Sequence, residues 1–260
     1  MSRLGRVYNH IKDDAELLFE RKNFGPEHYS TTGDLPSSFD LRDSGIFPSI
    51  LDQGQLGCCA GNEVSNALRF CLRKENGIDM QPSRLYIYYF GRMLDGSPLD
   101  QDTGMTISSA FHAVKHYGAC KEPLWPYDIS KFSQAPPKVA LSAAHQHVKN
   151  FDALSVPQDL VSIKQALLAG FPVVLGLQIY ESFESDATMA SGDVPMPGSD
   201  EKCLGGHALS LISYNDSTQR FVIENSWGTD VGQKGFFTVP YEYVLNKDLA
   251  SDLWTCKYFK

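Results

Sequence analysis

Apolar residues in the first half of the chain recur at the spacing expected of helices. In residues 61–73, the apolar side chains follow one another at intervals of three and four residues, which places them on one face of a helix: Val64, Ala67, Leu68 and Cys71. Three further segments are bounded by the turn residues that begin or end helices: 82–90, opened by Pro82, 107–117, closed by Gly118, and 161–169, closed by Gly170. The pattern predicts a helix in each of these segments.

Beyond residue 170 the pattern changes to that of strands. The segments rich in β-branched and aromatic residues are 172–179, 208–214, 220–223, 235–239 and 253–259. The polar residues 215–219 are typical of the turn of a hairpin. Because helices come first and antiparallel strands follow, we predict an α+β fold in which a helical lobe and an antiparallel β-rich lobe enclose a cleft.

Residues 1–34 hold too few apolar side chains to fold alone. Their one amphipathic segment, 13–22, is long enough for about two helical turns. We therefore divide the chain into an N-terminal arm, 1–34, which must dock on the remainder or stay mobile, and a globular domain, 35–260. Within that domain the polar stretch 184–202 is predicted to be a long surface loop.

Composition excludes several classes of protein. The 260 residues carry a net charge of −8 and contain no run of about 18 apolar residues, so neither nucleic acid nor a membrane is an expected partner. Six cysteines without a Cys-x-x-Cys pair exclude a disulfide scaffold, a zinc ribbon and a thioredoxin motif. The first residues lack the apolar core of a secretory signal, which predicts a cytoplasmic protein or one exported without a standard signal.

The first candidate for chemistry is Cys59, which ends a glycine-punctuated loop and lies at the N-terminal end of the helix predicted over 61–73. Unpaired backbone N–H groups and the helix dipole favour an anion at that position. We therefore expect the pKa of the Cys59 thiol to be depressed, so that part of it is the nucleophilic thiolate. The alternative is that Cys59 is a small apolar residue in the core.

Two later segments carry further candidates. His207 follows a pair of glycines and opens a predicted strand, where backbone or substrate can approach closely. Asn225 lies just beyond the strand predicted over 220–223, and its amide oxygen can accept a hydrogen bond from an imidazole and so fix the tautomer. Taken singly, a histidine is more often structural, and an asparagine at a strand end is a common turn residue.

Taken together, the order and spacing of these segments resemble the papain/cathepsin family of cysteine proteases. The frame Gln-Gly-x-x-Gly-x-Cys ends at Cys59, Gly-His ends at His207, and Asn-Ser-Trp-Gly begins at Asn225. His207 lies 148 residues after Cys59, which matches the roughly 130–150 residues of the family. The resemblance covers residues 35–260 and implies a papain-like fold with the active site in the cleft.

The resemblance also implies a role for each matching residue. Cys59 corresponds to the nucleophile, His207 to its general acid and base, and Asn225 to the residue that orients His207. Gln53 matches the glutamine that stabilises the oxyanion together with the Cys59 backbone N–H. Trp227 lies where the family shields the His–Asn hydrogen bond, and no cofactor is implied.

The family likewise implies a set of substrate-binding residues. Gly104 corresponds to the wall that exposes its backbone to an extended peptide, and Met105, Gly176 and Ala208 to the second pocket on the acyl side. Since these residues are small or apolar, we expect that pocket to prefer an apolar side chain. No metal site is expected, because His112 and His116 lack the glutamate of a His-Glu-x-x-His motif.

The chain departs from the family pattern in several places. Ala60 and Cys58 stand where the family carries tryptophan and serine, and Leu56 and Gln101 replace a pair of bridged cysteines. The arm 1–34 is far shorter than the family's prosegments, and we hypothesise that it lies across the cleft of a zymogen and limits access.

Two alternatives to a peptidase remain open, with peptides or proteins as the partners in each. One is a catalytically silent peptide-binding protein. The other is a thiol transferase or ligase on the same fold, although such enzymes more often use aspartate where this chain has Asn225. The sequence leaves the oligomeric state and the choice between endo- and exopeptidase open.

Overall fold

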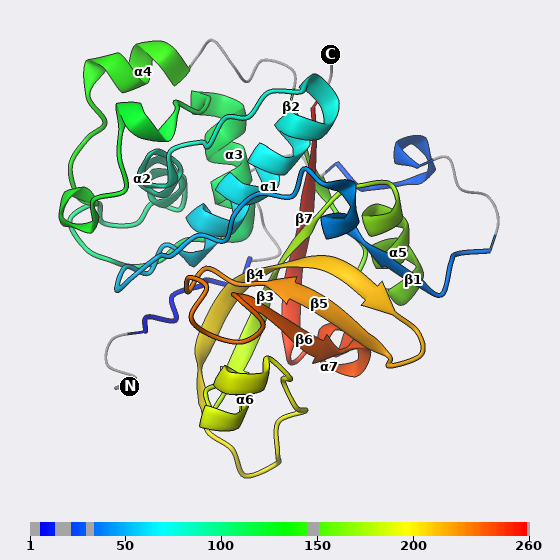
Figure 1. The fold of residues 1–260 in the computed structure, drawn as a ribbon. Coiled ribbons are helices and arrows are strands. Elements are labelled where there is room, and N and C mark those ends of the chain that lie inside the picture. The colour runs from blue at the N-terminus through cyan, green and yellow to red at the C-terminus, as the bar shows by residue number, and fades with distance from the viewer. Residues whose placement is uncertain (1–5, 14–21, 30–33, 145–150, 259–260) are drawn as a thin grey trace.

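A computed structural model describes residues 6–13, 22–29, 34–144 and 151–258. Four helices from residues 59–144 gather on one side of an antiparallel sheet built largely from the residues that follow them (Figure 1). They are α1 (Cys59–Asn76), α2 (Arg84–Leu94), α3 (Ile107–Tyr117) and α4 (Lys138–Ala144). The predicted α+β fold is thereby confirmed.

The sheet has the order β2-β7-β3-β4-β5-β6, and β1 pairs with β4 beside this path. Its strands are β1 (Ser38–Asp40), β2 (Phe151–Ser155), β3 (Val173–Tyr180), β4 (Cys203–Asn215), β5 (Arg220–Glu224), β6 (Phe236–Pro240) and β7 (Ala250–Tyr258). The shorter helices are α5 (Leu160–Leu168), α6 (Asp186–Ser191) and α7 (Tyr241–Leu245). Single 3-10 turns are formed by Pro26–His28, Leu41–Ser44, Glu122–Leu124 and Ile129–Lys131.

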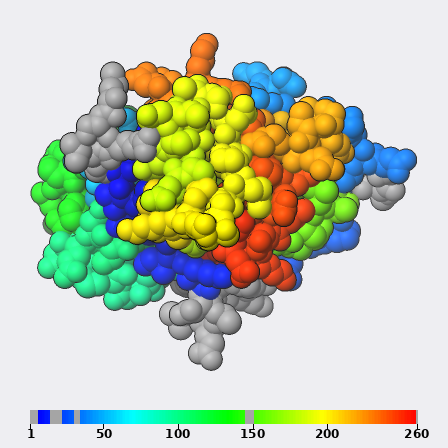
Figure 2. Space-filling model, turned by 90° about the horizontal axis from the view of Figure 1, so that it is seen from below, coloured from blue at the N-terminus to red at the C-terminus, as the bar shows by residue number. Residues whose placement is uncertain are grey.

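The arm docks at two places. Residues 6–13 lie between the two lobes, where Asn9 pairs in parallel with Gly206 of β4 and His10 pairs with Met105. Seen from below, the dark blue arm residues run between the teal part of the helical lobe and the yellow segment before β4 (Figure 2). Residues 22–29 dock on the end of β2, where the Phe24 N–H donates to the Ser155 carbonyl. The helix predicted over 13–22 falls largely outside the described residues.

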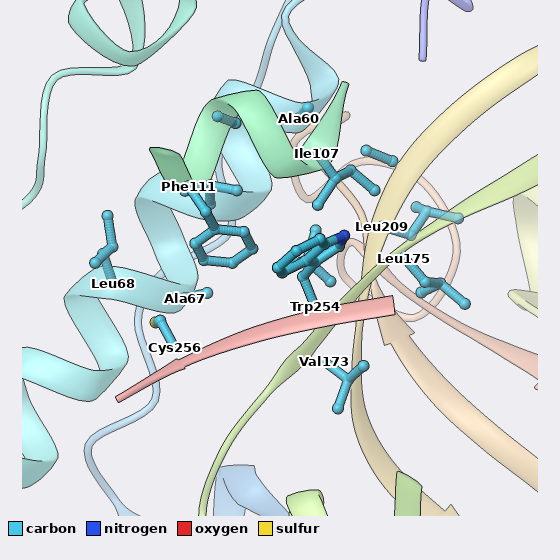
Figure 3. Close-up of a cluster of buried hydrophobic side chains, with 14 of the residues drawn as sticks. Ala60, Ala67, Leu68, Ile107, Phe111, Val173, Leu175, Leu209, Trp254 and Cys256 are labelled. Atoms are coloured by element: carbon cyan, nitrogen blue, oxygen red, sulfur yellow. The ribbon is translucent and has the colours of Figure 1, made fainter. Parts of the chain in front are cut away.

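The core lies where α1 crosses the sheet. Helix α1 packs against α2, α3, β4 and β7 and is buried over most of its length. Figure 3 shows Trp254 of β7 in this core beside Ile107 and Phe111 of α3, with Ala67 and Leu68 of α1 close by. Because α1 is enclosed by both lobes, its first residue is held at their junction.

No helix among the described residues is long and apolar enough to cross a membrane.

The observed helices and strands can be compared with those predicted from the sequence. Helices were predicted correctly at α1, α2, α3 and α5, whereas β1, β2, α4 and α7 were missed. The missed elements are short, and β1 and β2 are stabilised by pairing with β4 and β7 rather than by a pattern of their own.

Two predictions need correction. The stretch 184–202 is not wholly a loop, because it contains α6, and the Val194 N–H binds the Thr238 carbonyl of β6. His207 does not open its strand, since β4 begins at Cys203. The glycines before His207 extend the strand because their backbones pair with β3.

Candidate active site

Cys59 is the first residue of α1, at the junction of the two lobes. Its sulfur accepts hydrogen bonds from the backbone of Ala208 and from backbone N–H groups at the start of the helix. This contact joins the helical lobe to β4 beside His207. The residue is only 1% exposed.

His207 is held by Asn225, which follows β5. The imidazole Nε2 lies 2.9 Å from the Asn225 Oδ1. The backbone N–H of Ser226 donates to the same oxygen at 2.8 Å, which identifies that atom as the acceptor. Nε2 therefore carries the proton, and Nδ1, which has no hydrogen-bond partner within the described part of the chain, is left as the basic nitrogen.

Gln53 is fixed on both sides of its amide. Its Oε1 accepts a hydrogen bond from the Ser226 hydroxyl at 2.7 Å, and its Nε2 donates to the Leu56 carbonyl at 3.0 Å. The Tyr127 hydroxyl donates to the backbone carbonyl of Gln53 at 2.9 Å. One Nε2 hydrogen thus remains for a further acceptor, as an oxyanion site requires.

Trp227 stacks on the imidazole of His207 with ring centroids 4.9 Å apart and planes 20° apart. Phe183 and Phe237 contact the indole edge to face. The indole thus covers one face of the imidazole that binds Asn225.

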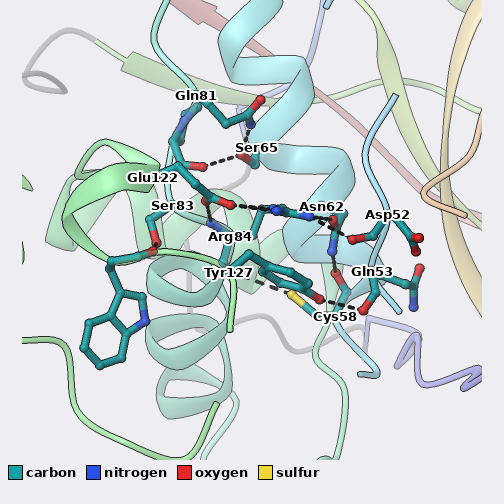
Figure 4. A network of polar contacts seen from close by, with 12 residues as sticks. Asp52, Gln53, Cys58, Asn62, Ser65, Gln81, Ser83, Arg84, Glu122 and Tyr127 are labelled. Carbon is teal, nitrogen blue, oxygen red and sulfur yellow. Dashed lines mark hydrogen bonds and ion pairs between the residues drawn. The ribbon is translucent and has the colours of Figure 1, made fainter. Parts of the chain in front are cut away.

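Cys58 faces away from Cys59, into the helical lobe. Its sulfur lies 3.9 Å from the Arg84 carbonyl and contacts Tyr127 (Figure 4). Arg84 in turn binds Glu122 at 2.7 Å and the Asn62 amide oxygen at 3.0 Å. Burial raises the pKa of Cys58 well above its ordinary value, so the Cys58 thiol stays protonated and unreactive.

A buried pair of carboxyl groups, Glu63 and Glu224, lies behind the site and was missed in the sequence. Glu63 is one helical turn after Cys59 and accepts a hydrogen bond from Ser210 at 2.6 Å, while Glu224 directly precedes Asn225 and accepts one from Asn66. Burial and their mutual repulsion raise the pKa of Glu63, and burial raises that of Glu224. An acidic residue before Asn225 in an otherwise apolar strand was the available signal.

The arm fills the cleft over these residues. The His10 N–H donates to the Gly206 carbonyl at 3.0 Å, and the Ile11 N–H donates to the Met105 carbonyl at 3.4 Å. The Asn9 side chain donates to the Asp102 carbonyl at 3.0 Å. The arm is thus bound to both walls by backbone, as an extended peptide would be.

Two side chains of the arm pack on the candidate catalytic residues. The Tyr8 ring meets His207 edge to face at 5.7 Å, and its hydroxyl binds Glu184. The Arg6 guanidinium lies 4.0 Å from the centroid of the Trp227 ring and 3.7 Å from Glu184. Both contacts anchor the arm to the segment between β3 and β4.

Under this cover the site holds neutral side chains. Burial raises the pKa of Cys59 to about 11, although backbone N–H groups act in the opposite direction. Burial also lowers the pKa of His207 to about 4, against the effect of Asn225. The depressed thiol pKa expected from the sequence is therefore wrong for this state, because desolvation outweighs the helix N-terminus.

Comparisons with known proteins agree with this geometry. A sequence model of the Papain family cysteine protease matches residues 35–252. The "Uncharacterized peptidase C1-like protein L477" of Acanthamoeba polyphaga mimivirus is 35% identical over 97% of this chain and 87% of its own length. The chain belongs to the papain family of cysteine proteases. Within this family, "Cysteine proteinase 2" of Zea mays is 26% identical over 78% of the chain, which spans 55% of that protein's length.

Solved structures of papain-family proteins show the same fold. Xylellain, a cysteine protease from Xylella fastidiosa, superposes with a TM-score of 0.84 at 30% identity, covering 97% of this chain and 96% of that one. The Carica candamarcensis protease CMS1MS2, solved in complex with E-64, has a TM-score of 0.68 at 19% identity and covers 87% of this chain and 100% of that one. The second likeness concerns the fold alone.

The substrate-binding residues expected of a papain-family protein are partly brought together. Gly104 has a φ of 73° and lies so close to the arm that a Cβ would overlap the Asn9 carbonyl. Gly176 and Ala208 pair across β3 and β4 beside His10. Met105 offers the arm its backbone, and its side chain is buried against glycines of α1 and α2.

Proposed function

We propose that the protein is a cysteine peptidase whose N-terminal arm inhibits it by occupying the substrate cleft. The observation that carries the proposal is the 2.9 Å contact between His207 Nε2 and Asn225 Oδ1, because it leaves Nδ1 of His207 as the base. The next residue of β4, Ala208, binds the Cys59 sulfur through its backbone. That arrangement matches the nucleophile, base and orienting group of papain-type catalysis.

The reaction proceeds in two halves. His207 takes the thiol proton as the Cys59 sulfur attacks the peptide carbonyl, and a carbon–sulfur bond forms while the carbonyl oxygen becomes an oxyanion. The Cys59 backbone N–H and the free Nε2 hydrogen of Gln53 bind that oxyanion. The imidazolium then protonates the leaving amine as the carbon–nitrogen bond breaks. Water, deprotonated by His207, hydrolyses the thioester and restores the thiol.

Inhibition by the arm rests on two features. Residues 8–10 bind both walls by backbone and cover His207 with the Tyr8 ring, so no substrate peptide fits in the cleft at the same time. Burial also favours the neutral forms of Cys59 and His207, and the arm residues His10 and Arg6 add to the lowering of the His207 pKa. Displacing the arm opens the cleft and favours the thiolate–imidazolium pair.

The catalytic assignment is tested by treating the full chain with a broad epoxysuccinyl inhibitor and mapping the adduct by mass. We expect one adduct, on Cys59. The rate at which it forms should fall in His207→Ala and stay unchanged in Cys58→Ser. Labelling of Cys58 alone would contradict the assignment. Cleavage of a peptide mixture, lost in Cys59→Ala, separates a peptidase from a silent binding protein, and formation of joined peptides would indicate a ligase.

The role of the arm is tested by point variants rather than by deletion of 1–34. Phe24 and Asp13 of the arm are buried against the domain, so a deletion also removes core contacts. Tyr8→Ala removes the ring over His207, and Tyr29→Ala serves as the control because that ring packs on Phe24, away from the cleft. We expect faster peptide cleavage only in Tyr8→Ala. Slower cleavage in that variant would indicate that the arm supports the site instead.

A further inference from the structure

The His10 side chain of the arm lies in a space that two glycines keep open. A Cβ on Gly176 of β3 would overlap the imidazole, and a Cβ on Gly206 of β4 would lie 3.2 Å from its Nδ1. Gly176 pairs with Ala208 in the sheet, so three positions around the ring carry a methyl group or less. This space is the pocket assigned above to the second residue on the acyl side of the scissile bond.

An acidic residue, Asp252, forms the floor of this pocket. The His10 Nε2 lies 3.3 Å from the Asp252 Oδ2, and the two side chains are 1% and 6% exposed. Asp252 stands in no motif of the sequence, and the residues expected to line the pocket are all small or apolar. The structure places the carboxylate against the His10 side chain, which fills the pocket.

The backbone of β7 is distorted at Asp252 in a way that directs this carboxylate. The register between β3 and β7 shifts by one residue between Val174 and Gly176, which makes a bulge of Asp252 and Leu253. Asp252 has a φ of 57°, in the left-handed region that non-glycine residues rarely adopt. Bulges and strained residues of this kind occur next to functional sites, where they redirect a side chain.

Much of what binds the Asp252 carboxylate belongs to the arm. Besides His10, the backbone N–H of Asp13 donates to Oδ2 at 3.2 Å. From the domain itself, the Ser251 hydroxyl donates to Oδ2 at 2.8 Å. When the arm leaves, a nearly buried carboxylate loses its basic neighbour, and the space held by His10 and Asp13 becomes free. A buried charge in that position favours a cationic partner and penalises an apolar one.

We propose that Asp252 makes this pocket select a basic side chain, arginine or lysine, as the second residue on the acyl side of the cleaved bond. The proposal rests on the proposed peptidase function and replaces the apolar preference expected from the sequence. His10 of the arm then acts as a tethered stand-in for the substrate's basic residue. Arginine is the better fit of the two, since its guanidinium can donate two parallel hydrogen bonds to one carboxylate.

The test uses the full chain and a pair of peptidyl vinyl sulfones that differ only in carrying arginine or leucine at that position. The second-order rate of Cys59 labelling is measured by intact mass for the wild type, Asp252→Asn and His10→Ala. Asn keeps the size and the acceptor oxygen of Asp252 but removes its charge. His10→Ala is the matched control, because it also loosens the arm while leaving the carboxylate in place.

We expect the arginine probe to react at least tenfold faster than the leucine probe in the wild type and in His10→Ala, and this ratio to fall about tenfold or more in Asp252→Asn. Comparing ratios cancels the effect of a loosened arm, which speeds both probes alike. A ratio near one in the wild type, or a ratio that Asp252→Asn leaves unchanged, would overturn the proposal.

A second measurement does not depend on catalysis. Hydrogen exchange of the His10 and Ile11 amides at pH 6 reports how firmly the arm is docked, because these amides bind Gly206 and Met105. We expect exchange about tenfold faster in Asp252→Asn than in the wild type, and unchanged exchange would count against the proposal. If neither probe labels Cys59 while exchange responds as expected, the peptidase function fails and the charge preference of the pocket stands.

Discussion

The strongest prediction concerns the coupling between the arm and the protonation of the site. Tyr8→Ala removes the ring that lies over His207 and the hydroxyl that binds Glu184. With the arm in place, the pKa of Cys59 is about 11 and that of His207 about 4. Both values favour the neutral thiol and the neutral imidazole over the thiolate–imidazolium pair at neutral pH. At pH 7 only about one thiol in ten thousand is ionised.

The assay is the rate of Cys59 alkylation by iodoacetamide between pH 5 and pH 10. In the wild type we expect the rate to rise about tenfold per pH unit through neutral pH, because ionisation of a high-pKa thiol limits it. In Tyr8→Ala burial is relieved, so the pKa of Cys59 falls and that of His207 rises. The profile should then level off at a lower pH, with a rate at pH 7 at least tenfold above that of the wild type.

The shape of the profile separates protonation from access. If the arm acted only as a steric cover, Tyr8→Ala would raise the rate by the same factor at every pH, and the two profiles would run parallel. Parallel profiles would refute the electrostatic part of the argument. Tyr29→Ala should reproduce the wild-type profile, since its ring stacks on Phe24, outside the cleft.

Three further predictions follow from the same contacts. Asn225→Ala frees the imidazole of His207 and should lower kcat by about tenfold to a hundredfold, the worth of a buried hydrogen bond of 1–3 kcal/mol, with little change in KM in a peptide-cleavage assay. Gln53→Ala removes an oxyanion donor and should lower kcat about 10²–10³-fold; a change confined to KM would contradict that role. Because Glu63 and Glu224 have raised pKa values, the folded state retains protons that the unfolded state has lost above about pH 4.5. The free energy of unfolding in urea should therefore fall as the pH rises from about 4.5 to the folded-state pKa, by about 1.4 kcal/mol per pH unit for each retained proton. Glu224→Gln should make this fall less steep.

The fold class was open to prediction because each lobe has its own local pattern. The interval of three and four residues in α1 and the β-rich segments after residue 170 are properties of short windows of sequence. Elements such as β1 and β2 were missed, since they exist through pairing with β4 and β7 rather than through a pattern of their own. The same limit applies to α6, which lies inside a stretch that is polar throughout.

The candidate site divides in the same way. Cys59, His207 and Asn225 stand in motifs with fixed neighbours, so the sequence alone determined which residues to consider and in what order. Glu63, Glu224 and Asp252 belong to no sequence motif. They are relevant to the site because the fold buries their carboxyl groups close to it.

What the tertiary structure alone decided is the state of that site. Residues 8–10 approach His207 and Gly206 from nearly two hundred positions away in the chain, and no local pattern encodes that contact. Burial of Cys59 in the folded protein raises a thiol pKa that the helix N-terminus alone would lower. A motif specifies which groups are present, whereas protonation and selectivity depend on which other groups the fold brings within a few ångströms of them.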